Sequence, residues 1–270
     1  MLVGYHAVFD KDYLDTVAYA ADNEFDYVQF DLNVPRFYLD QLTGREVRRI
    51  RAAAADRHVG LSFHAPGDNV SLFTDFPAVR EGLLRQMHLI LQRANDLGAR
   101  HLTVHPGLCP SFREAGEGDD AYRAEYWGYY GRVLSDNLRW MAERAGTVLV
   151  CVENFGTVDL AFQSLAEIRD RGLPVYLCWD FAKSQSQAGA EVFFRTNAAQ
   201  IREVHVHDLD DQGHSHEIVG EGTMEFGRYA DLIERADVAT TIEVGPREAA
   251  SESRRRLAEI LSARRTSGPE

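Results

Sequence analysis

Histidine, glutamate and aspartate side chains recur at the points where short apolar segments of the sequence end. These residues are His6, His64, His105, Glu153, Asp180, His205, His207 and Glu243. Carboxylates and imidazoles that a fold brings together repel one another or lose hydration unless a cation neutralises them. A shared divalent metal ion is therefore the simplest chemistry that this set of residues predicts.

The ligand types narrow the choice of metal. The oxygen-rich subset consists of Glu153, Asp180, His205 and Glu243. Three carboxylates with one imidazole suit Mn²⁺ or Zn²⁺, and Mg²⁺ or Co²⁺ would also accept them. His64 and His105 offer nitrogen ligands for a second ion, with Glu153 as a bridge between the two. We therefore expect one or two divalent ions as the cofactor.

The elements that must position these residues alternate along the chain. The predicted strands are Leu2–His6, Phe25–Leu32, Val59–His64, Arg100–His105, Val148–Glu153, Val175–Asp180, Glu203–His207 and Thr240–Val244. Apolar residues at helical spacing fall in Tyr13–Ala21, Gly44–Arg57, Val79–Leu97, Tyr122–Arg144, Leu160–Arg171, Ala188–Ala199, Gly227–Arg235 and Ala249–Ala263. Eight alternations predict an α/β protein, a (β/α)8 TIM barrel whose strand ends converge on one rim. An open, doubly wound sheet is the alternative.

Length, charge and cysteine content constrain the class of protein. The 270 residues suit one barrel domain over residues 1–264, followed by a flexible C-terminal tail over 265–270. The net charge of −13 gives no sign of a basic groove for nucleic acid. An odd count of three cysteines provides no disulfide framework, so we expect a cytoplasmic protein. No apolar stretch reaches membrane-spanning length. The sequence is compatible with a homo-oligomer.

Each of these residues also has a simpler interpretation when it is taken alone. A histidine at a strand end is commonly a hydrogen-bonded core residue. Asp180 would serve as the N-cap of a following helix, and Glu243 would pair with Arg247. Such interpretations must hold independently at seven strand ends, so a shared ion is the more economical explanation.

Several short strings resemble one known superfamily. They are Phe63-His64-Ala65-Pro66, His105-Pro106-Gly107, Val152-Glu153-Asn154, Trp179-Asp180, Val204-His205-Val206-His207-Asp208, His216-Glu217-Ile218-Val219-Gly220-Glu221-Gly222 and Ile242-Glu243. Together they span nearly the whole chain and resemble the endonuclease IV and xylose isomerase-like TIM barrels, which include sugar phosphate isomerases and epimerases. The resemblance implies that the four-ligand set of the isomerases and epimerases maps onto Glu153, Asp180, His205 and Glu243. It also implies that the extra ligands of the endonuclease branch map onto His64, His105 and His216.

The chain departs from the endonuclease pattern at two positions of that branch's third zinc site. Lys183 stands where that branch has a histidine, and His214 stands where it has an aspartate. A lysine ammonium cannot ligate a metal, so a trinuclear site is in doubt. Lys183 would instead bind a substrate phosphate or oxyanion, or be an exposed lysine in the first turn of a helix.

The function that this sequence favours is isomerisation or epimerisation of a small sugar, sugar phosphate or related polyol. The metal would chelate adjacent carbonyl and hydroxyl oxygens and so favour proton transfer through an enediolate. We predict Glu153, Glu243 and Lys183 as catalytic residues, the two glutamates acting as general base and acid. The predicted substrate-binding residues are His6, His207, His214 and Arg36.

Two other functions remain as alternatives. One is an endonuclease IV-like phosphodiester hydrolase that acts on abasic DNA, for which the segment Asn33-Val34-Pro35-Arg36 resembles a DNA-facing loop but also fits a polar turn. The other is a non-catalytic barrel subunit. Two long segments, Pro106–Asp120 and Asp208–Glu225, are predicted to form lids over the strand ends.

Overall fold

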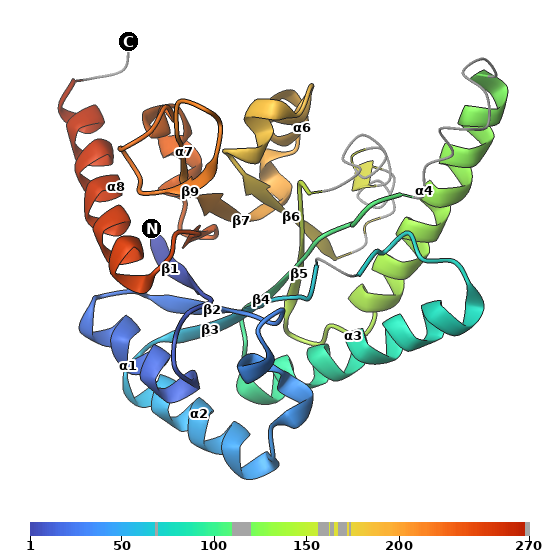
Figure 1. Cartoon of the computed structure of the whole chain (residues 1–270), viewed down its shortest axis with the longest axis horizontal. Helices are drawn as coiled ribbons and strands as arrows, with labels where there is room; N and C mark the ends of the chain where they lie inside the picture. The colour runs from blue at the N-terminus through green and yellow to red at the C-terminus, as the bar shows by residue number, and fades with distance from the viewer. Residues whose placement is uncertain are drawn as a thin grey trace.

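The protein is described by a computed structural model over residues 1–67, 70–109, 120–155, 162, 165–166, 172 and 174–267. Eight parallel strands close into a barrel in the order β1-β10-β7-β6-β5-β4-β3-β2 (Figure 1). They are β1 (Leu2–Ala7), β2 (Tyr27–Asp31), β3 (Gly60–His64), β4 (His101–Val104), β5 (Leu149–Glu153), β6 (Val175–Asp180), β7 (Ile201–Val206) and β10 (Ala239–Ile242). This closed barrel confirms the predicted (β/α)8 class and excludes the open sheet.

Helices surround the barrel on its outer face (Figure 1). They are α1 (Tyr13–Asp22), α2 (Gly44–Asp56), α3 (Pro77–Leu97), α4 (Asp120–Ala142), α6 (Ala190–Thr196), α7 (Ala230–Ile233) and α8 (Arg247–Ser267). Single 3₁₀ turns are η1 (Pro35–Phe37), η2 (Leu39–Gln41), η3 (Lys183–Ser186), η4 (Ala198–Gln200) and η5 (Phe226–Tyr229). The last helix, α8, packs beside the first strand, β1, which completes the ring of helices.

Local sequence signals explain where several helices begin. The Asp12 side chain accepts hydrogen bonds from the backbone N–H groups of Leu14 and Asp15 and so caps α1. Thr43 and Glu46 form a reciprocal capping box at the start of α2. These caps satisfy backbone donors that would otherwise lack a partner, and they fix the entry of each helix against the barrel.

Three predicted segments differ from the observed elements or lie partly outside the described residues. Helix α8 continues to Ser267, so the predicted end of the barrel domain at residue 264 falls inside this helix. Most of the predicted helix Leu160–Arg171 and much of the predicted lid Pro106–Asp120 lie outside the described residues. The other predicted lid, Asp208–Glu225, holds a short antiparallel pair, β8 (Asp208–Leu209) and β9 (Ser215–Glu217).

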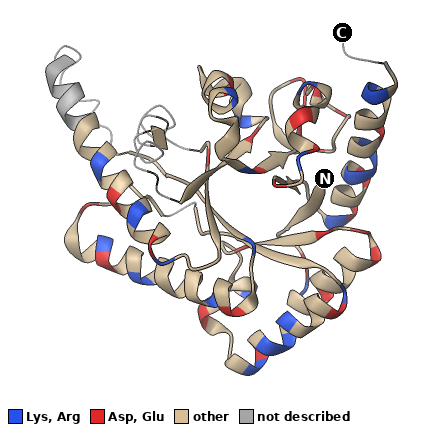
Figure 2. Ribbon diagram, turned by 180° about the vertical axis from the view of Figure 1, so that it is seen from behind, with Lys and Arg blue, Asp and Glu red and all other residues tan. Residues whose placement is uncertain are grey.

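Charge is distributed over the outer helices. Lys and Arg residues are mixed with Asp and Glu residues along helices such as α8, where Arg255 pairs with Glu252 and Glu259 (Figure 2). Mixed charges of this kind are typical of a solvated helix face. Among the described residues, no helix combines the length and the apolar character that crossing a bilayer requires.

The strand register determines which side chains meet inside the barrel. Asp180 on β6 is the direct neighbour of His205 on β7, and His205 is the neighbour of Thr241 on β10. Because side chains alternate along a strand, residues two positions apart on β7 face the same side. The carboxyl ends of β5, β6, β7 and β10 therefore present polar side chains to one shared rim.

Candidate metal centre and substrate pocket

Four side chains meet at the carboxyl ends of four strands. Glu153 and Asp180 are the last residues of β5 and β6, His205 lies within β7, and Glu243 directly follows β10. One ligand atom from each lies within 4.8 Å of the ligand atoms of the other three. All four side chains are buried. The structure thus brings together the residues that the sequence predicted as ligands of one ion.

Two atoms in this cluster lack the partners that buried polar atoms normally have. His205 Nδ1 lies 3.4 Å from Glu153 Oε2 and 3.4 Å from Glu243 Oε2. Among the described residues, neither His205 Nδ1 nor Glu243 Oε2 has a hydrogen-bond partner. Since more than about 90% of buried polar groups are normally satisfied, such atoms indicate a missing partner. The donor set fits a divalent cation.

Asn154 connects the ends of β5 and β6 beneath the cluster. Its side-chain amide donates to the Asp180 carbonyl at 3.0 Å, and its Oδ1 accepts from the Asp180 backbone N–H at 2.7 Å. The same amide reaches Ser184 Oγ and Gln187 Oε1 on the following turn. This reciprocal contact fixes the backbone of Asp180 and therefore the place of its carboxylate.

Lys183 extends its ammonium into the carboxylate cluster from η3. Its Nζ contacts Glu153 Oε1, lies 2.9 Å from Asp180 Oδ2 and lies 3.8 Å from Glu243 Oε2. Burial opposes the charged form, but Asp180 and Glu153 outweigh it and hold the pKa of Lys183 well above its usual value. The interpretation of Lys183 as an exposed lysine is therefore wrong.

The surroundings of the three carboxyl groups in the cluster favour their charged form. Burial would raise the pKa of Glu153, Asp180 and Glu243, but the adjacent Lys183 ammonium holds each of these pKa values below its usual range. Neighbouring histidines contribute in the same direction. The cluster therefore presents concentrated negative charge, which favours a cation.

A second group of ligand atoms shares Glu153. His64 Nε2 and His105 Nε2 each lie 3.1 Å from Glu153 Oε2. The His105 ring stacks on Phe155 at a centroid distance of 4.0 Å, and its Nδ1 has no hydrogen-bond partner among the described residues. His64, His105 and Glu153 are thus close enough to share one ion, as the sequence predicted for a second site.

His207 and His216 lie on the other side of Asp180 and Glu243. His207 Nε2 lies 3.2 Å from Asp180 Oδ2, and the backbone N–H of His216 donates to His207 Nδ1 at 3.0 Å. The His216 ring stacks on His207, and His216 Nδ1 donates to the Glu243 carbonyl at 2.8 Å. One ligand atom each from His207, His216 and Glu243 also forms a compact group.

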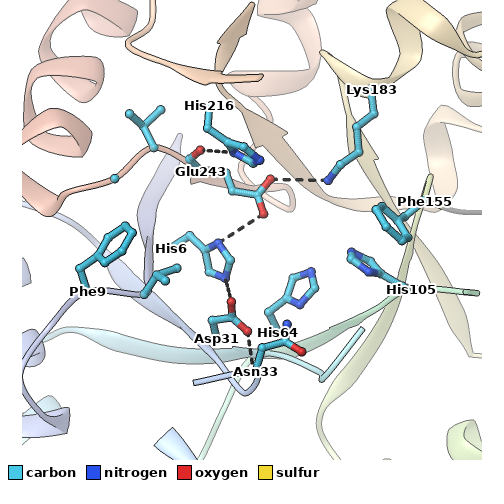
Figure 3. A pocket seen from close by; sticks show the side chains of 13 residues that line it. His6, Phe9, Asp31, Asn33, His64, His105, Phe155, Lys183, His216 and Glu243 are labelled. Atoms are coloured by element: carbon cyan, nitrogen blue, oxygen red, sulfur yellow. Dashed lines mark hydrogen bonds and ion pairs between the residues drawn. The ribbon is translucent and has the colours of Figure 1, made fainter. Parts of the chain in front are cut away.

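A cavity of about 460 Å³ opens above the cluster (Figure 3). It is lined by His6, Val8, Phe9, Asp31, Asn33, His64, His105, Phe155, Lys183, His216, Glu243, Val244 and Gly245. Phe9 and Phe155 stand at opposite sides of this cavity, and imidazoles and carboxylates lie between them (Figure 3). A pocket that combines apolar walls with a few polar groups is typical of small-molecule sites.

The predicted substrate-binding residues divide between the pocket and other places. His6 lines the pocket, whereas His207 is buried behind Asp180 and is not part of the lining. His214 is exposed and pairs with Asp210 at 2.7 Å, because the turn between β8 and β9 directs it outward. Arg36 donates to the Asp10 carbonyl at 2.7 Å and also lies outside the lining. His207, His214 and Arg36 thus lie outside the lining of this cavity, and their part in substrate binding stays a prediction.

A buried carboxylate beneath the cluster escaped the sequence analysis. Glu203, two residues before His205, is fully buried in the barrel interior. Its carboxylate accepts hydrogen bonds from Gln29 Nε2, His101 Nε2, Thr103 Oγ1, Thr241 Oγ1 and His205 Nε2. Burial opposes ionisation, but His101 and the other donors outweigh it and hold the pKa of Glu203 well below its usual range. If His205 Nε2 carries the proton of that contact, its Nδ1 is free to face the cluster.

Asp31 is a second residue that the sequence analysis missed. It ends β2, lines the pocket and lies 3.8 Å from His6 Nε2. The signal for both missed residues was their position: Asp31 closes a strand, and Glu203 shares the inward face of β7 with His205. Each could have been found by extending the strand-end and alternation arguments to every strand.

Comparison with known proteins places the chain in a family. A family model described as "Xylose isomerase-like TIM barrel" matches residues 17–260. The chain belongs to the xylose isomerase-like TIM barrel family. This confirms the superfamily that the sequence strings resemble. No curated protein sequence matches this chain at a significant level.

Solved structures share the fold of this xylose isomerase-like barrel. A D-tagatose 3-epimerase-like protein is similar with a TM-score of 0.76 and 20% identity, covering 99% of both chains. The 3-keto-D-glucoside 4-epimerase of E. coli has a TM-score of 0.71 and 18% identity, covering 96% of this chain and 99% of its own. Endonuclease IV of Thermus thermophilus has a TM-score of 0.70 and 18% identity, covering 97% of this chain and 100% of its own. At these identities the likeness establishes the fold alone.

Proposed function

We propose that this protein is a divalent-metal-dependent epimerase or isomerase of a small sugar, sugar phosphate or related polyol ketone. The observation that carries the proposal is the placement of Glu153 and Glu243 around one ion-sized cluster beneath a pocket of about 460 Å³. The fold shared with structures named as tagatose, ribulose and 3-keto-glucoside epimerases supports the same class of reaction.

Four side chains would hold the metal. They are Glu153, Asp180, His205 and Glu243, an oxygen-rich set for which Mn²⁺ or Zn²⁺ is the leading choice and Mg²⁺ or Co²⁺ a further one. Bound there, a divalent ion supplies Lewis-acid polarisation of a carbonyl oxygen. His64 and His105, with Glu153, would hold a second ion. The ligand role of His216 stays a prediction that follows from its place beside His207 and Glu243.

The two glutamates would carry the proton transfer. Glu153 ends β5 and Glu243 follows β10, strands that are not neighbours in the barrel, so their carboxylates reach the cluster from different sides. One would remove the proton from the carbon next to the substrate carbonyl, and the other would return a proton to the opposite face of the enediolate. His6 contacts Glu243 Oε1 and would orient that carboxylate.

The remaining parts of the pocket would hold the substrate. Asp31, Asn33 and His6 offer hydrogen-bonding groups for hydroxyls, while Phe9 and Phe155 offer apolar faces for carbon–hydrogen surfaces. Lys183 would supply a positive charge at the pocket edge. Cys151 and Cys178 are buried thiols outside any disulfide, and the reducing cytoplasm stays the expected location.

Solvent-exchange measurements on simple ketoses test the proposal. The Mn²⁺-loaded protein is incubated in D₂O with D-fructose, D-tagatose, D-allulose and L-ribulose, and NMR follows epimer formation and deuterium at the carbon next to the carbonyl. We expect exchange with at least one sugar, its loss after EDTA treatment, and its loss in Glu243→Gln. Failure of the metal-loaded protein to exchange any of these four ketoses, or their phosphates measured in the same way, would refute the proposal.

A phosphodiester hydrolase is the second candidate. The close approach of His64 and His105 to Glu153 Oε2 favours it, because a carboxylate shared by two ligand groups suits two-metal hydrolysis. Lys183 counts against a third ion, since its ammonium fills the place of a ligand. Nicking of an abasic DNA duplex by Zn²⁺-loaded protein, with no nicking after EDTA treatment, would favour this activity over epimerisation.

A further inference from the structure

The Lys183 ammonium lies inside the cluster that would hold the metal. It contacts Glu153 and Asp180 directly and lies 3.8 Å from Glu243. Those three carboxylates belong to the four-residue group whose ligand atoms all lie within 4.8 Å of one another. The side chain is only 21% exposed, so the amine is part of the cluster and not a surface charge.

An ammonium and a divalent ion compete for the same lone pairs. Lysine offers three donors and no acceptor, so each carboxylate oxygen that it contacts is engaged by an N–H group. A divalent ion at the cluster would also be strongly repelled by a positive charge only a few ångströms away. The contacts of Lys183 with Glu153 and Asp180 are therefore incompatible with full coordination of an ion by the same two residues.

We propose that Lys183 is a displaceable internal cation that neutralises the ligand cluster in the metal-free protein and leaves it when the metal binds. The proposal rests on the metal site of the proposed function. In the metal-free state the positive charge of the ammonium takes the place of the ion and holds the carboxylates close together. Like charges packed this closely would otherwise repel one another.

The pocket offers a destination for the displaced amine. Lys183 lines the cavity above the cluster, and its Nζ lies 5.6 Å from the centroid of the Phe155 ring (Figure 3). The face of an aromatic ring attracts a cation at this distance. Because this distance is found with the ammonium still on Glu153 and Asp180, a short shift toward Phe155 would release the two carboxylates. It would carry the positive charge to the wall of the substrate pocket, where it would face substrate oxygens.

Metal affinity provides the first test. Mn²⁺ binding is measured by isothermal titration calorimetry for the wild-type protein, Lys183→Met and Lys11→Met. Methionine keeps the length of the side chain and removes the charge, while exposed Lys11 provides the matched control. We expect Lys183→Met to bind Mn²⁺ at least about tenfold more tightly than wild type, because the competing charge is gone. Lys11→Met is expected to match wild type.

The outcomes separate this proposal from the proposed function. Binding by Lys183→Met alone would show that the ammonium excludes the ion outright, which would overturn displacement and the metal dependence of the wild-type protein. Equal affinities in wild type and Lys183→Met would overturn the competition and leave the metal site intact. Absence of Mn²⁺ and Zn²⁺ binding in both proteins would overturn the competition and the metal-dependent function together.

Amine reactivity gives a second test in the unaltered protein. The sequence contains only two lysines, Lys11 and Lys183, among 29 basic residues. Reductive methylation followed by mass spectrometry therefore reports on Lys183 with Lys11 as an internal reference. We expect Lys183 to react slowly in the metal-free protein and faster after Mn²⁺ loading, at a constant rate for Lys11. An unchanged Lys183 rate on loading with bound Mn²⁺ would contradict displacement.

Discussion

His6 Nδ1 lies 3.3 Å from Glu243 Oε1, and on its other side His6 Nε2 lies 3.8 Å from Asp31 Oδ2 (Figure 3). The imidazole thus bridges a proposed proton-transfer carboxylate and a second carboxylate at the end of β2. Replacing His6 by Gln would remove the bridge but keep a polar side chain. We expect kcat to fall about tenfold or more, with Mn²⁺ affinity little changed.

Steady-state kinetics and calorimetry on the same preparation check this prediction. Asp31→Asn, which loses only the outer contact, is expected to lie between wild type and His6→Gln in kcat. A parallel loss of metal affinity in His6→Gln would show instead that His6 shapes the ligand cluster.

Gly67 packs so closely against His105 that it offers a way to disturb the second ion alone. A Cβ at this position would lie 2.2 Å from His105 Nδ1, so Gly67→Ala must push the imidazole aside. We expect Gly67→Ala to lose the ion shared by His64, His105 and Glu153 while keeping the four-ligand ion. The zinc content of the dialysed, Zn²⁺-loaded protein, measured by elemental analysis, would then fall by one ion per chain.

Gly82 provides the matched control for that experiment. A Cβ there meets no atom within 4 Å, so Gly82→Ala in α3 is expected to keep the wild-type metal content. An unchanged metal content in Gly67→Ala, with His105 displaced in its structure, would argue against a second ion on these residues.

Asn154 holds the ends of β5 and β6 together through both faces of its amide. Alanine at this position would leave the buried Asp180 backbone N–H without its partner. We expect Asn154→Ala to lower the free energy of unfolding by about 2 to 4 kcal/mol, measured by urea denaturation of the metal-free protein. His214→Ala, at an exposed position outside the pocket, is expected to have a free energy of unfolding within about 0.5 kcal/mol of wild type. An equally small change in Asn154→Ala would show that the Asn154 amide does not stabilise the strand ends.

Glu203 predicts a distinct dependence of stability on pH. Its folded pKa lies well below the ordinary glutamate value of 4.5, so the folded protein holds the charged form more strongly than the unfolded chain does. The stabilisation is fully present above pH 4.5 and is lost as the pH falls towards the folded pKa. Glutamine does not titrate, so Glu203→Gln would lack this pH-dependent part of the free energy of unfolding.

Denaturation across an acidic pH series checks the sign. We expect Glu203→Gln to be less stable than wild type by about 3 kcal/mol near neutral pH, because buried donors lose their charged partner. The gap is expected to narrow below pH 4.5. A gap that stays constant or widens with acid would show that the charge of Glu203 does not stabilise the fold.

The barrel was predictable because its signals are local. The buried parallel strands give short, largely apolar runs, and most of the barrel strands end in or are followed by a histidine or a carboxylate residue. The four-ligand cluster followed from that topology, since parallel strands end at one rim. Side-chain direction was harder to predict: His207 follows β7 but is buried behind Asp180, and His214 points outward from a turn.

The position of the Lys183 ammonium could not be predicted from the sequence, for a different reason. Its position three residues after Asp180 was visible in the sequence, but a flexible side chain can reach solvent, substrate or neighbouring carboxylates from the same backbone. Only the combined charges of Glu153, Asp180 and Glu243 decide between these positions. Glu203 was missed for a related reason, because a carboxylate in the barrel interior depends on donors from other strands.

The loop between β7 and α7 depends on one carboxylate, that of Asp208. Its two oxygens accept the backbone N–H groups of Leu209, Gly220 and Met224, which ties the beginning, middle and end of the loop to a single point. All three donors are main-chain N–H groups, so the contacts themselves do not depend on the side chains of the donor residues, although the positive φ of Gly220 favours glycine there. Exposed residues of this loop can therefore be exchanged without rebuilding its scaffold, and the pocket-lining position of His216 stays anchored beside them.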